Sequence, residues 1–229
     1  MNAKEFSSFL SDISSKHLTV IDASFPKSEY VPIDFSSNNV DLKNFKSSSA
    51  KACQKYISAF LKKHNKTIAY GGYLEKRNLY KRSKTFNQQH SETERNIHLG
   101  IDLWIDAETN VLSAFNGEIH SFKNNIGFGD YGPTIIVKHD INSVEFYTLY
   151  GHLSRHSLSN LTIGKTIRQG EVLGQLGTAK VNGDYAPHLH FQIIKDLQNN
   201  HGDYPGVISG IDLEYYKNNC PDPNLVLKL

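Results

Sequence analysis

Short apolar or alternating runs recur along the chain from about residue 66 onward. Gly, Asn, Asp and Pro separate them at intervals of roughly 8–15 residues, the spacing of strands joined by turns. The pattern predicts a mainly β domain over residues 66–229, built as a small antiparallel β-sandwich or open barrel. Its last 20 residues contain Pro221 and Pro223, which oppose helix, and are expected to form an irregular wrap. The runs are TIAYGGYL, HLGIDLWI, VLSAFNGEIHSF, PTIIVKHD, VEFYTLYGHL, VLGQLG and HLHFQII.

Residues 1–65 differ in composition and are expected to form a Ser-rich N-terminal extension with one or two helices. The first 50 residues hold 12 serines, against 10 in the rest of the chain. A second helix is expected over roughly residues 48–64, capped by Ser47. The extension is also a candidate inhibitory segment that covers a cleft. Four apolar residues near the start follow the i, i+3, i+4, i+7 spacing of an amphipathic helix: Phe6, Phe9, Leu10 and Ile13.

Length, cysteine content and charge exclude several classes of protein. A chain of 229 residues can bury a core without disulfide staples, and Cys53 and Cys220 are too few for a disulfide framework. Lys and Arg number 25 and Asp and Glu 23, so the net charge of +2 gives no support for a nucleic-acid or polybasic membrane surface. No apolar run approaches the roughly 18 residues of a membrane span. The N-terminal stretch MNAKEFSSFLSDISSKH lacks the apolar segment of a signal peptide, so by sequence the chain is expected to be cytoplasmic.

Two histidines in the run PHLHFQII are expected to share one surface. His188 and His190 are two residues apart, and residues i and i+2 of a strand point to the same face. The apolar Leu189 and Phe191 then occupy the opposite face. Two exposed strand histidines would give the same pattern, so this pair alone does not define a site.

A histidine and a carboxylate lie in the run HLGIDLW. In a straight strand His98 and Asp102 would lie about 13 Å apart, too far to share a metal ion. Gly100 permits a bend or bulge that brings the two side chains together. Together with one histidine of the HLH pair they make three protein ligands, and a catalytic zinc commonly has three protein ligands and a position for water. The other histidine of the pair would then lie beside that water.

His152 follows the strand-like run FYTLY and the small residue Gly151. By itself it is consistent with an ordinary turn histidine. The order HxxxD, GH and HxH in one all-β chain is far less expected by chance, and it makes His152 a candidate for the same site. The sequence contains no HExxH, no GxSxG and no Gly-rich phosphate loop in the required setting.

These motifs resemble those of the lysostaphin-like (LytM-type) zinc metallopeptidases, which are peptidoglycan endopeptidases with a small antiparallel β fold. The resemblance covers about residues 95–195, and every position that the family uses for chemistry is filled. The segments YLEKRNLY and CPDPN show a weaker resemblance to a branch of this family in which the peptidase-like domain can be fused to other enzymes. The matching stretches are HLGIDLW, VLSAFNGEIHSF, DYGPTIIVKHD, FYTLYGHLS, IGKTIRQGEVLGQLG and NGDYAPHLHFQI.

The resemblance implies a role for each motif residue. His98, Asp102 and His190 would bind one zinc ion per chain. His188 would be the general base that activates water, and His152 would support the scissile carbonyl oxygen or the tetrahedral intermediate. Family members act outside the cytoplasm, so the analogy implies a periplasmic or extracellular location.

Polar residues near these motifs are candidates for substrate contacts. Glu and Arg side chains in a groove can orient the charged ends of a peptide, although an ordinary charged loop has the same composition. The candidates for substrate binding are Tyr73, Glu75, Arg77, Tyr131 and Asn182.

Three functions compete at this point. The complete ligand set favours a zinc endopeptidase acting on peptides of peptidoglycan cross-links or on muropeptides. The absence of a signal peptide favours a cytosolic zinc amidohydrolase acting on another small amide. The third alternative is a non-catalytic wall-binding or regulatory domain, although relatives of that kind have typically lost ligands and this sequence has lost none.

Overall fold

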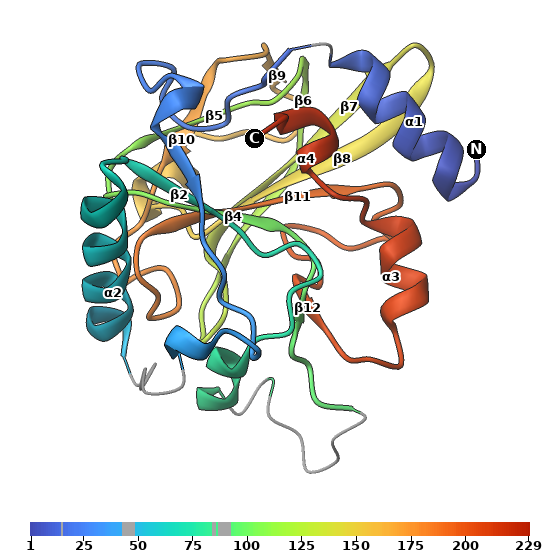
Figure 1. Cartoon of the computed structure of the whole chain (residues 1–229). Coiled ribbons are helices and arrows are strands. Elements are labelled where there is room, and N and C mark those ends of the chain that lie inside the picture. The colour runs from blue at the N-terminus through green and yellow to red at the C-terminus, as the bar shows by residue number, and fades with distance from the viewer. Residues whose placement is uncertain (15, 43–48, 84–85, 87–92) are drawn as a thin grey trace.

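An eight-stranded sheet runs through the middle of the molecule (Figure 1). The computed structural model describes residues 1–14, 16–42, 49–83, 86 and 93–229. The strand order is β1-β2-β4-β11-β8-β7-β6-β9, with β1 and β2 parallel and the other neighbours antiparallel. Since β1 and β9 are its edges, the described sheet does not close into a barrel. The expected mainly β, antiparallel-rich fold with a helical N-terminal part is confirmed.

The strands of the large sheet come from most of the chain, and two smaller sheets flank it. The large sheet contains β1 (Tyr30–Pro32), β2 (Ile68–Gly71), β4 (Ile101–Trp104), β6 (Gly117–Asn125), β7 (Gly132–Ile141), β8 (Val144–Gly151), β9 (Thr166–Ile167) and β11 (His188–Ile194). The two-stranded sheets pair β5 (Asn110–Leu112) with β10 (Val172–Gln175), and β3 (Ile97–His98) with β12 (Val207–Ile208).

Side-chain alternation in β11 decides which residues face the core. Leu189, Phe191 and Ile193 lie in the largest cluster of buried apolar side chains. His188 and His190 line a cavity instead. The expected separation of the two histidines from their apolar neighbours is therefore present. Apolar burial anchors one face of the strand and leaves the other face for polar side chains.

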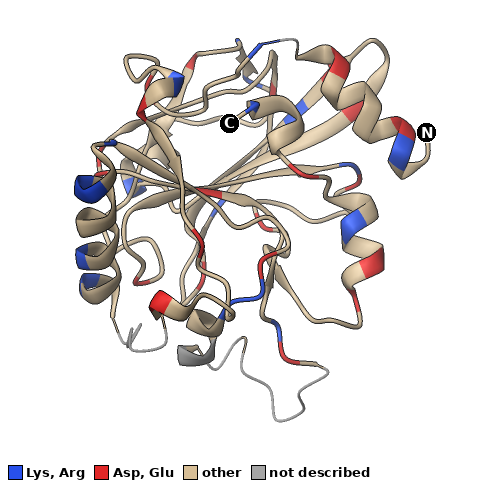
Figure 2. Ribbon diagram, in the orientation of Figure 1, with Lys and Arg blue, Asp and Glu red and all other residues tan. Residues whose placement is uncertain are grey.

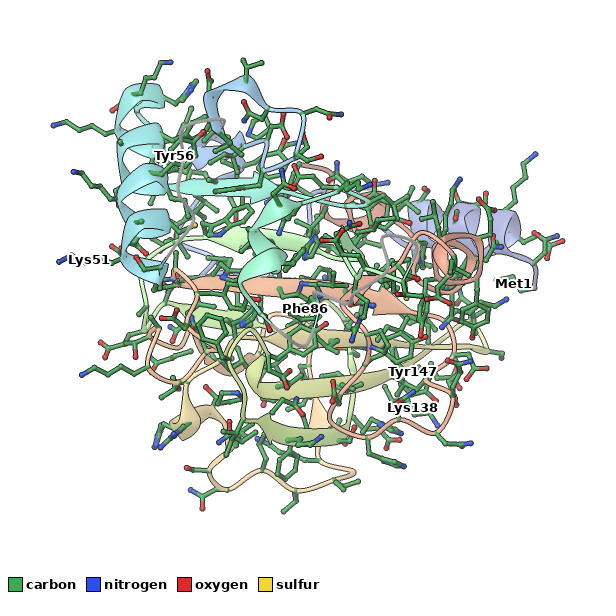
Figure 3. The ribbon with its side chains drawn as sticks, turned by 90° about the horizontal axis from the view of Figure 1, so that it is seen from below. Met1, Lys51, Tyr56, Phe86, Lys138 and Tyr147 are labelled. Atoms are coloured by element: carbon green, nitrogen blue, oxygen red, sulfur yellow. The ribbon has the colours of Figure 1, made fainter. Side chains whose placement is uncertain are left out.

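Two helices of the first 65 residues pack on the sheet. α1 (Ala3–Ile13) begins with a capping box between Asn2 and Glu5 and buries Phe6 and Leu10. α2 (Ala50–His64) lies beside β2 in Figure 1 and carries a row of lysines, blue in Figure 2. In Figure 3 Lys51 extends away from α2, whereas Tyr56 packs edge-on against Phe35. Short 3-10 helices lie between the larger elements: η1 (Lys27–Glu29), η2 (Val40–Leu42), η3 (Asn78–Arg82) and η4 (Arg155–Leu158).

The ends of the expected helices differ in detail from the sequence prediction. α2 is capped by Ser49, whose side chain accepts a hydrogen bond from the Ala52 N–H. The predicted cap Ser47 lies outside the described residues. The division of the chain after residue 65 stays a prediction, although β1 and α1 contribute to the same sheet and core as the later strands.

The expectation of an irregular C-terminal wrap is wrong. The tail contains α3 (Leu213–Asn219) and α4 (Asn224–Leu227). Pro223 is the N-cap of α4, a position where the missing N–H costs no helical hydrogen bond. Pro221 follows the C-cap of α3, so the two prolines separate the helices without breaking either of them. Val226 and Leu227 of α4 are buried in the main core.

Candidate active site

A break between two short strands brings His98 and Asp102 together. β3 ends at His98 and β4 begins at Ile101, so the chain bends at Leu99 and Gly100. His98 Nε2 lies 3.1 Å from Asp102 Oδ1. The bend expected at Gly100 is therefore present, and it shortens the separation of about 13 Å that a straight strand would impose.

Strand register places His190 directly opposite Asp102. β11 pairs with β4 so that His190 faces Asp102 and His188 faces Trp104. A Cβ built on Gly100 would lie 2.6 Å from Cε1 of His190, so a side chain at this position would collide with the ring. Glycine at position 100 thus allows the approach of His190 as well as the bend.

Three buried side-chain atoms converge at this point. His98 Nε2 lies 2.8 Å from His190 Nδ1, and Asp102 Oδ1 lies 3.1 Å from the first nitrogen and 3.2 Å from the second. The outer nitrogens of both rings face oxygen acceptors. His98 Nδ1 donates to the Gly72 carbonyl at 2.9 Å, and His190 Nε2 donates to Gln192 Oε1 at 2.9 Å.

These outer hydrogen bonds leave three acceptors facing one another. A neutral imidazole has one N–H, so lone pairs remain at His98 Nε2 and His190 Nδ1, beside the carboxylate of Asp102. Such a cluster can hold a cation between its atoms. Zinc accepts two imidazole nitrogens and one carboxylate oxygen, and ligands bound tetrahedrally at about 2.0–2.1 Å lie about 3.3 Å apart. His98, Asp102 and His190 therefore fit a zinc ion and leave one position for water.

Two further histidines lie beside these three residues. The ring centroids of His152 and His188 are 4.2 Å apart, and His188 Nε2 lies 3.8 Å from Asp102 Oδ1. His188 Nδ1 donates to the Ala186 carbonyl at 2.7 Å, and His152 Nδ1 donates to the Asn182 carbonyl at 2.9 Å. In their neutral forms both rings therefore keep Nε2 as an acceptor.

Burial and neighbouring charges set the protonation of the site. Burial lowers the pKa of His98 to about 4 and also lowers the pKa of His188. Burial and the nearby His188 lower the pKa of His152 well below its usual value. Burial acts to raise the pKa of Asp102, but His98 and Arg77 hold it well below its usual range. Near neutral pH His98, His152 and His188 are neutral and the carboxylate of Asp102 is ionised, which are the forms that bind metals and accept protons.

A cavity of about 330 Å³ adjoins these residues. Phe86, labelled near the centre of Figure 3, belongs to its wall. Trp104 stacks on His188 with 5.7 Å between the ring centroids. A cavity with an apolar wall and a few convergent polar groups is the usual form of a small-ligand or peptide site. The described aromatic residues that line it are Phe35, Tyr80, Phe86, Trp104, Tyr131, Tyr185 and Tyr204.

The predicted substrate contacts fall into two groups. Tyr131 and Arg77 line the cavity. Tyr131 Oη lies 3.4 Å from Nε2 of His190, so this ring is next to the candidate ligands. Arg77 is directed at Asp102 and Glu75. A substrate contact by either residue stays a prediction.

The other three predicted contacts are not among the described residues that line the cavity. Tyr73 Oη donates to the main-chain oxygen of Cys220 at 2.8 Å. Glu75 accepts from Arg77 and from the Phe35 N–H. Asn182 is fully buried and supports the site through its main-chain oxygen, which accepts from His152.

Sequence reasoning missed several residues that hold the ligands in place. Gln192 follows His190 by two residues on the same strand, and the alternation that paired the histidines would have included it. Trp104 could be found in the same way, because it lies two residues beyond Asp102 on β4. No signal in the sequence indicates that the carbonyl of Gly72 accepts from His98, since that contact depends on the packing of β2 against the β3–β4 bend.

Comparisons with known proteins agree with the motifs. The sequence description of peptidase family M23 matches residues 96–202. The comparison with curated proteins found no match. Among solved structures, the catalytic domain of the antimicrobial peptidase lysostaphin from Staphylococcus simulans is 22% identical, covers 53% of this chain and 80% of that chain, and has a TM-score of 0.37.

Two further solved structures are similar to part of the chain. A putative peptidase M23 from Pseudomonas aeruginosa is 17% identical over 62% of this chain, with a TM-score of 0.39, and the match spans 52% of that protein's length. A zinc containing peptidase from Vibrio cholerae is 24% identical, covers 47% of this chain and 30% of that chain, and has a TM-score of 0.35. These TM-scores lie below 0.5, so the assignment depends on the family match and on the motifs. The family that the comparisons identify is therefore peptidase family M23, whose model matches residues 96–202 of this chain.

Proposed function

We propose that the chain is a zinc-dependent metalloendopeptidase that hydrolyses peptide bonds in peptidoglycan cross-links or muropeptides. The observation that carries the proposal is the convergence of three acceptor atoms, from His98, Asp102 and His190, beside two neutral imidazoles in one cavity. The match of residues 96–202 to a peptidase family supports peptide hydrolysis as the reaction. The wall substrate follows from the resemblance to lysostaphin-like enzymes.

The candidate ligands have the composition of a catalytic zinc site. A zinc ion bound there would act as a Lewis acid, lowering the pKa of water toward 7 and polarising the scissile carbonyl. Each ligand is oriented by an outer partner, namely the Gly72 carbonyl, Arg77 or Gln192. Such partners fix the tautomer and direction of a ligand before the metal binds.

His188 is the proposed general base. Its Nδ1 is held by the Ala186 carbonyl, so Nε2 is the atom that accepts a proton from the attacking water. Its lowered pKa keeps the ring neutral and ready to accept. Trp104 stacks against the ring and restricts its orientation.

His152 is proposed to support the developing negative charge on the carbonyl oxygen. In the neutral form its Nδ1 donates to Asn182, so Nε2 can donate to an oxyanion only after it gains a proton. The close ring of His188 is the neighbouring group that could share such a proton. The two histidines are therefore expected to act as a coupled pair in the pH dependence of catalysis.

The first experiment measures zinc by elemental mass spectrometry in the wild type and in Asp102→Ala, alongside hydrolysis of soluble muropeptides. We expect one zinc per chain in the wild type and a loss of zinc in Asp102→Ala. His188→Ala should retain zinc but reduce turnover by roughly 10²–10⁴-fold, the usual contribution of a general base. His156→Ala, at an exposed position, is the control and should change neither quantity.

The alternatives predict different results in the same experiment. Zinc with no hydrolysis of any wall fragment would favour a binding or regulatory domain. Hydrolysis of small amides without hydrolysis of muropeptides would favour the amidohydrolase. Among the described residues, no helix combines the length and hydropathy needed to cross a bilayer. Cell fractionation would test the proposed periplasmic or extracellular location against a cytoplasmic one.

A further inference from the structure

Arg77 is a buried cation in contact with a candidate metal ligand. Its side chain is 2% exposed, and Nη1 lies 2.5 Å from Asp102 Oδ2. Its Nε lies 2.5 Å from Glu75 Oε2. A guanidinium is a planar fork that fixes the direction of the carboxylates it binds, which a lysine ammonium cannot do.

The contact divides the two oxygens of Asp102 between different partners. Oδ2 binds Arg77, whereas Oδ1 faces His98 Nε2 and His190 Nδ1. A carboxylate held in this way offers one oxygen to an ion. If Oδ2 were free, the carboxylate could rotate or offer both oxygens, and the ligand geometry would no longer be unique.

Arg77 is itself held by residues from three parts of the chain. The guanidinium carbon lies 5.6 Å from the ring centroid of Trp104 and 6.0 Å from that of Phe35. Glu75 Oε1 accepts a hydrogen bond from the Phe35 N–H at 2.8 Å. Nη1 of Arg77 also lies 3.3 Å from Tyr80 Oη. The path from the main chain at Phe35 through Glu75 and Arg77 to Asp102 is therefore continuous.

The charges explain why the position requires a cation. Without Arg77, the buried carboxylate of Asp102 and the carboxylate of Glu75, which is 11% exposed, would both lose a cationic partner, which is costly. Arg77 lies between the two carboxylates and gives each of them a cationic partner.

We propose that Arg77 is a positioning residue of the metal centre, which engages Asp102 Oδ2 so that Oδ1 alone is presented to the ion. This inference depends on the proposed zinc site. It assigns Arg77 a role different from the substrate contact predicted from the sequence. It also makes the segment around Phe35, in the first 65 residues, part of the support of the ligand set.

The test measures zinc affinity by competition with a chelator for the wild type, Arg77→Lys and Arg95→Met. Arg77→Lys keeps the charge but removes the fork, and we expect zinc binding to weaken roughly 10–100-fold, as for other partners of metal ligands. Arg95→Met is the matched control, because Arg95 also lines the cavity but donates to the main-chain oxygen of Val207. Its zinc affinity should equal that of the wild type.

A spectroscopic measurement separates positioning from general damage. With Co²⁺ in place of zinc, the visible absorption of Arg77→Lys should weaken and shift, because a released Asp102 can bind through both oxygens and raise the coordination number. The spectrum of Arg95→Met should match the wild type. Wild-type zinc affinity together with a wild-type cobalt spectrum in Arg77→Lys would overturn the inference.

A second variant keeps the inference testable if Arg77→Lys does not fold. Glu75→Gln leaves Arg77 and Asp102 in place but removes the negative charge that binds Nε of the Arg77 guanidinium. We expect a smaller loss of zinc affinity in the same direction, and an unchanged affinity would count against the proposed path. Failure of the wild type itself to bind zinc would instead reject the proposed function.

Discussion

At the scale of single residues, the candidate site depends on Gly72, because a side chain at this position would collide with its neighbours. Gly72 has φ +105°, a conformation that L-residues rarely adopt. A Cβ at this position would lie 1.9 Å from Arg77 Nη2 and 3.0 Å from His98 Nδ1. Its carbonyl also fixes the tautomer of His98. One glycine therefore serves both the ligand and the arginine that orients Asp102.

Gly72→Ala should weaken both folding and zinc binding. Backbone strain alone costs about 1–3 kcal/mol, and the collision with Arg77 adds to it. Because His98 loses its orienting partner, we expect zinc affinity to fall roughly tenfold or more. Gly164→Ala is the matched control, since Gly164 has φ +81° and no atom within 4 Å of a built Cβ. Equal zinc affinity in the two variants would contradict this role for Gly72.

At the scale of elements, helices from both ends of the chain pack into the core that the strands form. Phe6 of α1 packs edge-on against Phe146 of β8, with 5.9 Å between the ring centroids. The side chain of Ser14, the C-cap of α1, donates to the main-chain oxygen of Val226 in α4. In Figure 1, α1 accordingly lies near α4, at the end of the molecule that holds both termini. The inhibitory role of the N-terminal segment stays a prediction.

Leu10→Ala should show that α1 stabilises the whole fold. Leu10 is fully buried in the main core, and such truncations cost about 2–5 kcal/mol. The free energy of unfolding, measured with urea, should fall by this amount in one cooperative transition. Ser8→Ala, on the exposed face of the same helix, should have little effect. A loss confined to α1, with the strands unfolding as in the wild type, would show that the helix is only loosely attached.

At the scale of the whole molecule, a further buried histidine lies away from the candidate site. His139 of β7 has no exposure, and its ring packs on Phe115 and Phe146. Its Nδ1 donates to the Asn116 carbonyl at 2.9 Å, and Nε2 lies 2.7 Å from Thr148 Oγ1. The ring therefore holds neighbouring strands together as a neutral polar group.

This histidine should make the stability of the fold depend on pH. Burial lowers the pKa of His139 from 6.5 to about 4. Below pH 6.5 the unfolded chain gains a proton that the folded protein does not take up until near pH 4. The free energy of unfolding should therefore fall by about 3 kcal/mol across this window.

The measurement compares urea unfolding of the wild type, His139→Gln and the exposed control His156→Gln at several pH values. His139→Gln should be less stable than the wild type at pH 7, and the difference should shrink by about 3 kcal/mol at pH 4. His156→Gln should follow the wild-type curve. Parallel pH curves for the wild type and His139→Gln would show that this ring does not titrate differently on unfolding.

The sequence by itself determined the strands, the two N-terminal helices and the association of the histidine motifs. Alternation of apolar residues is local information, so it placed His188 and His190 on one face of β11 and Leu189 and Phe191 on the other. Gly100 indicated the bend in the same local way. The prolines of the tail were misleading, because their effect depends on whether they fall inside a helix or at its end, as Pro223 does.

Only the tertiary structure decided which atoms meet. The pairing of β11 with β4 sets His190 opposite Asp102, and such pairing joins residues 88 positions apart in the chain. The tertiary structure also directs Arg77 toward Asp102, although its charge suggested a substrate contact. Phe35, from the N-terminal part of the chain, packs against the guanidinium of Arg77. A sequence shows that a charged residue is present, but the tertiary structure determines whether that residue is buried and which residue pairs with it. A buried charge needs an opposite charge beside it, because leaving it unpaired is costly.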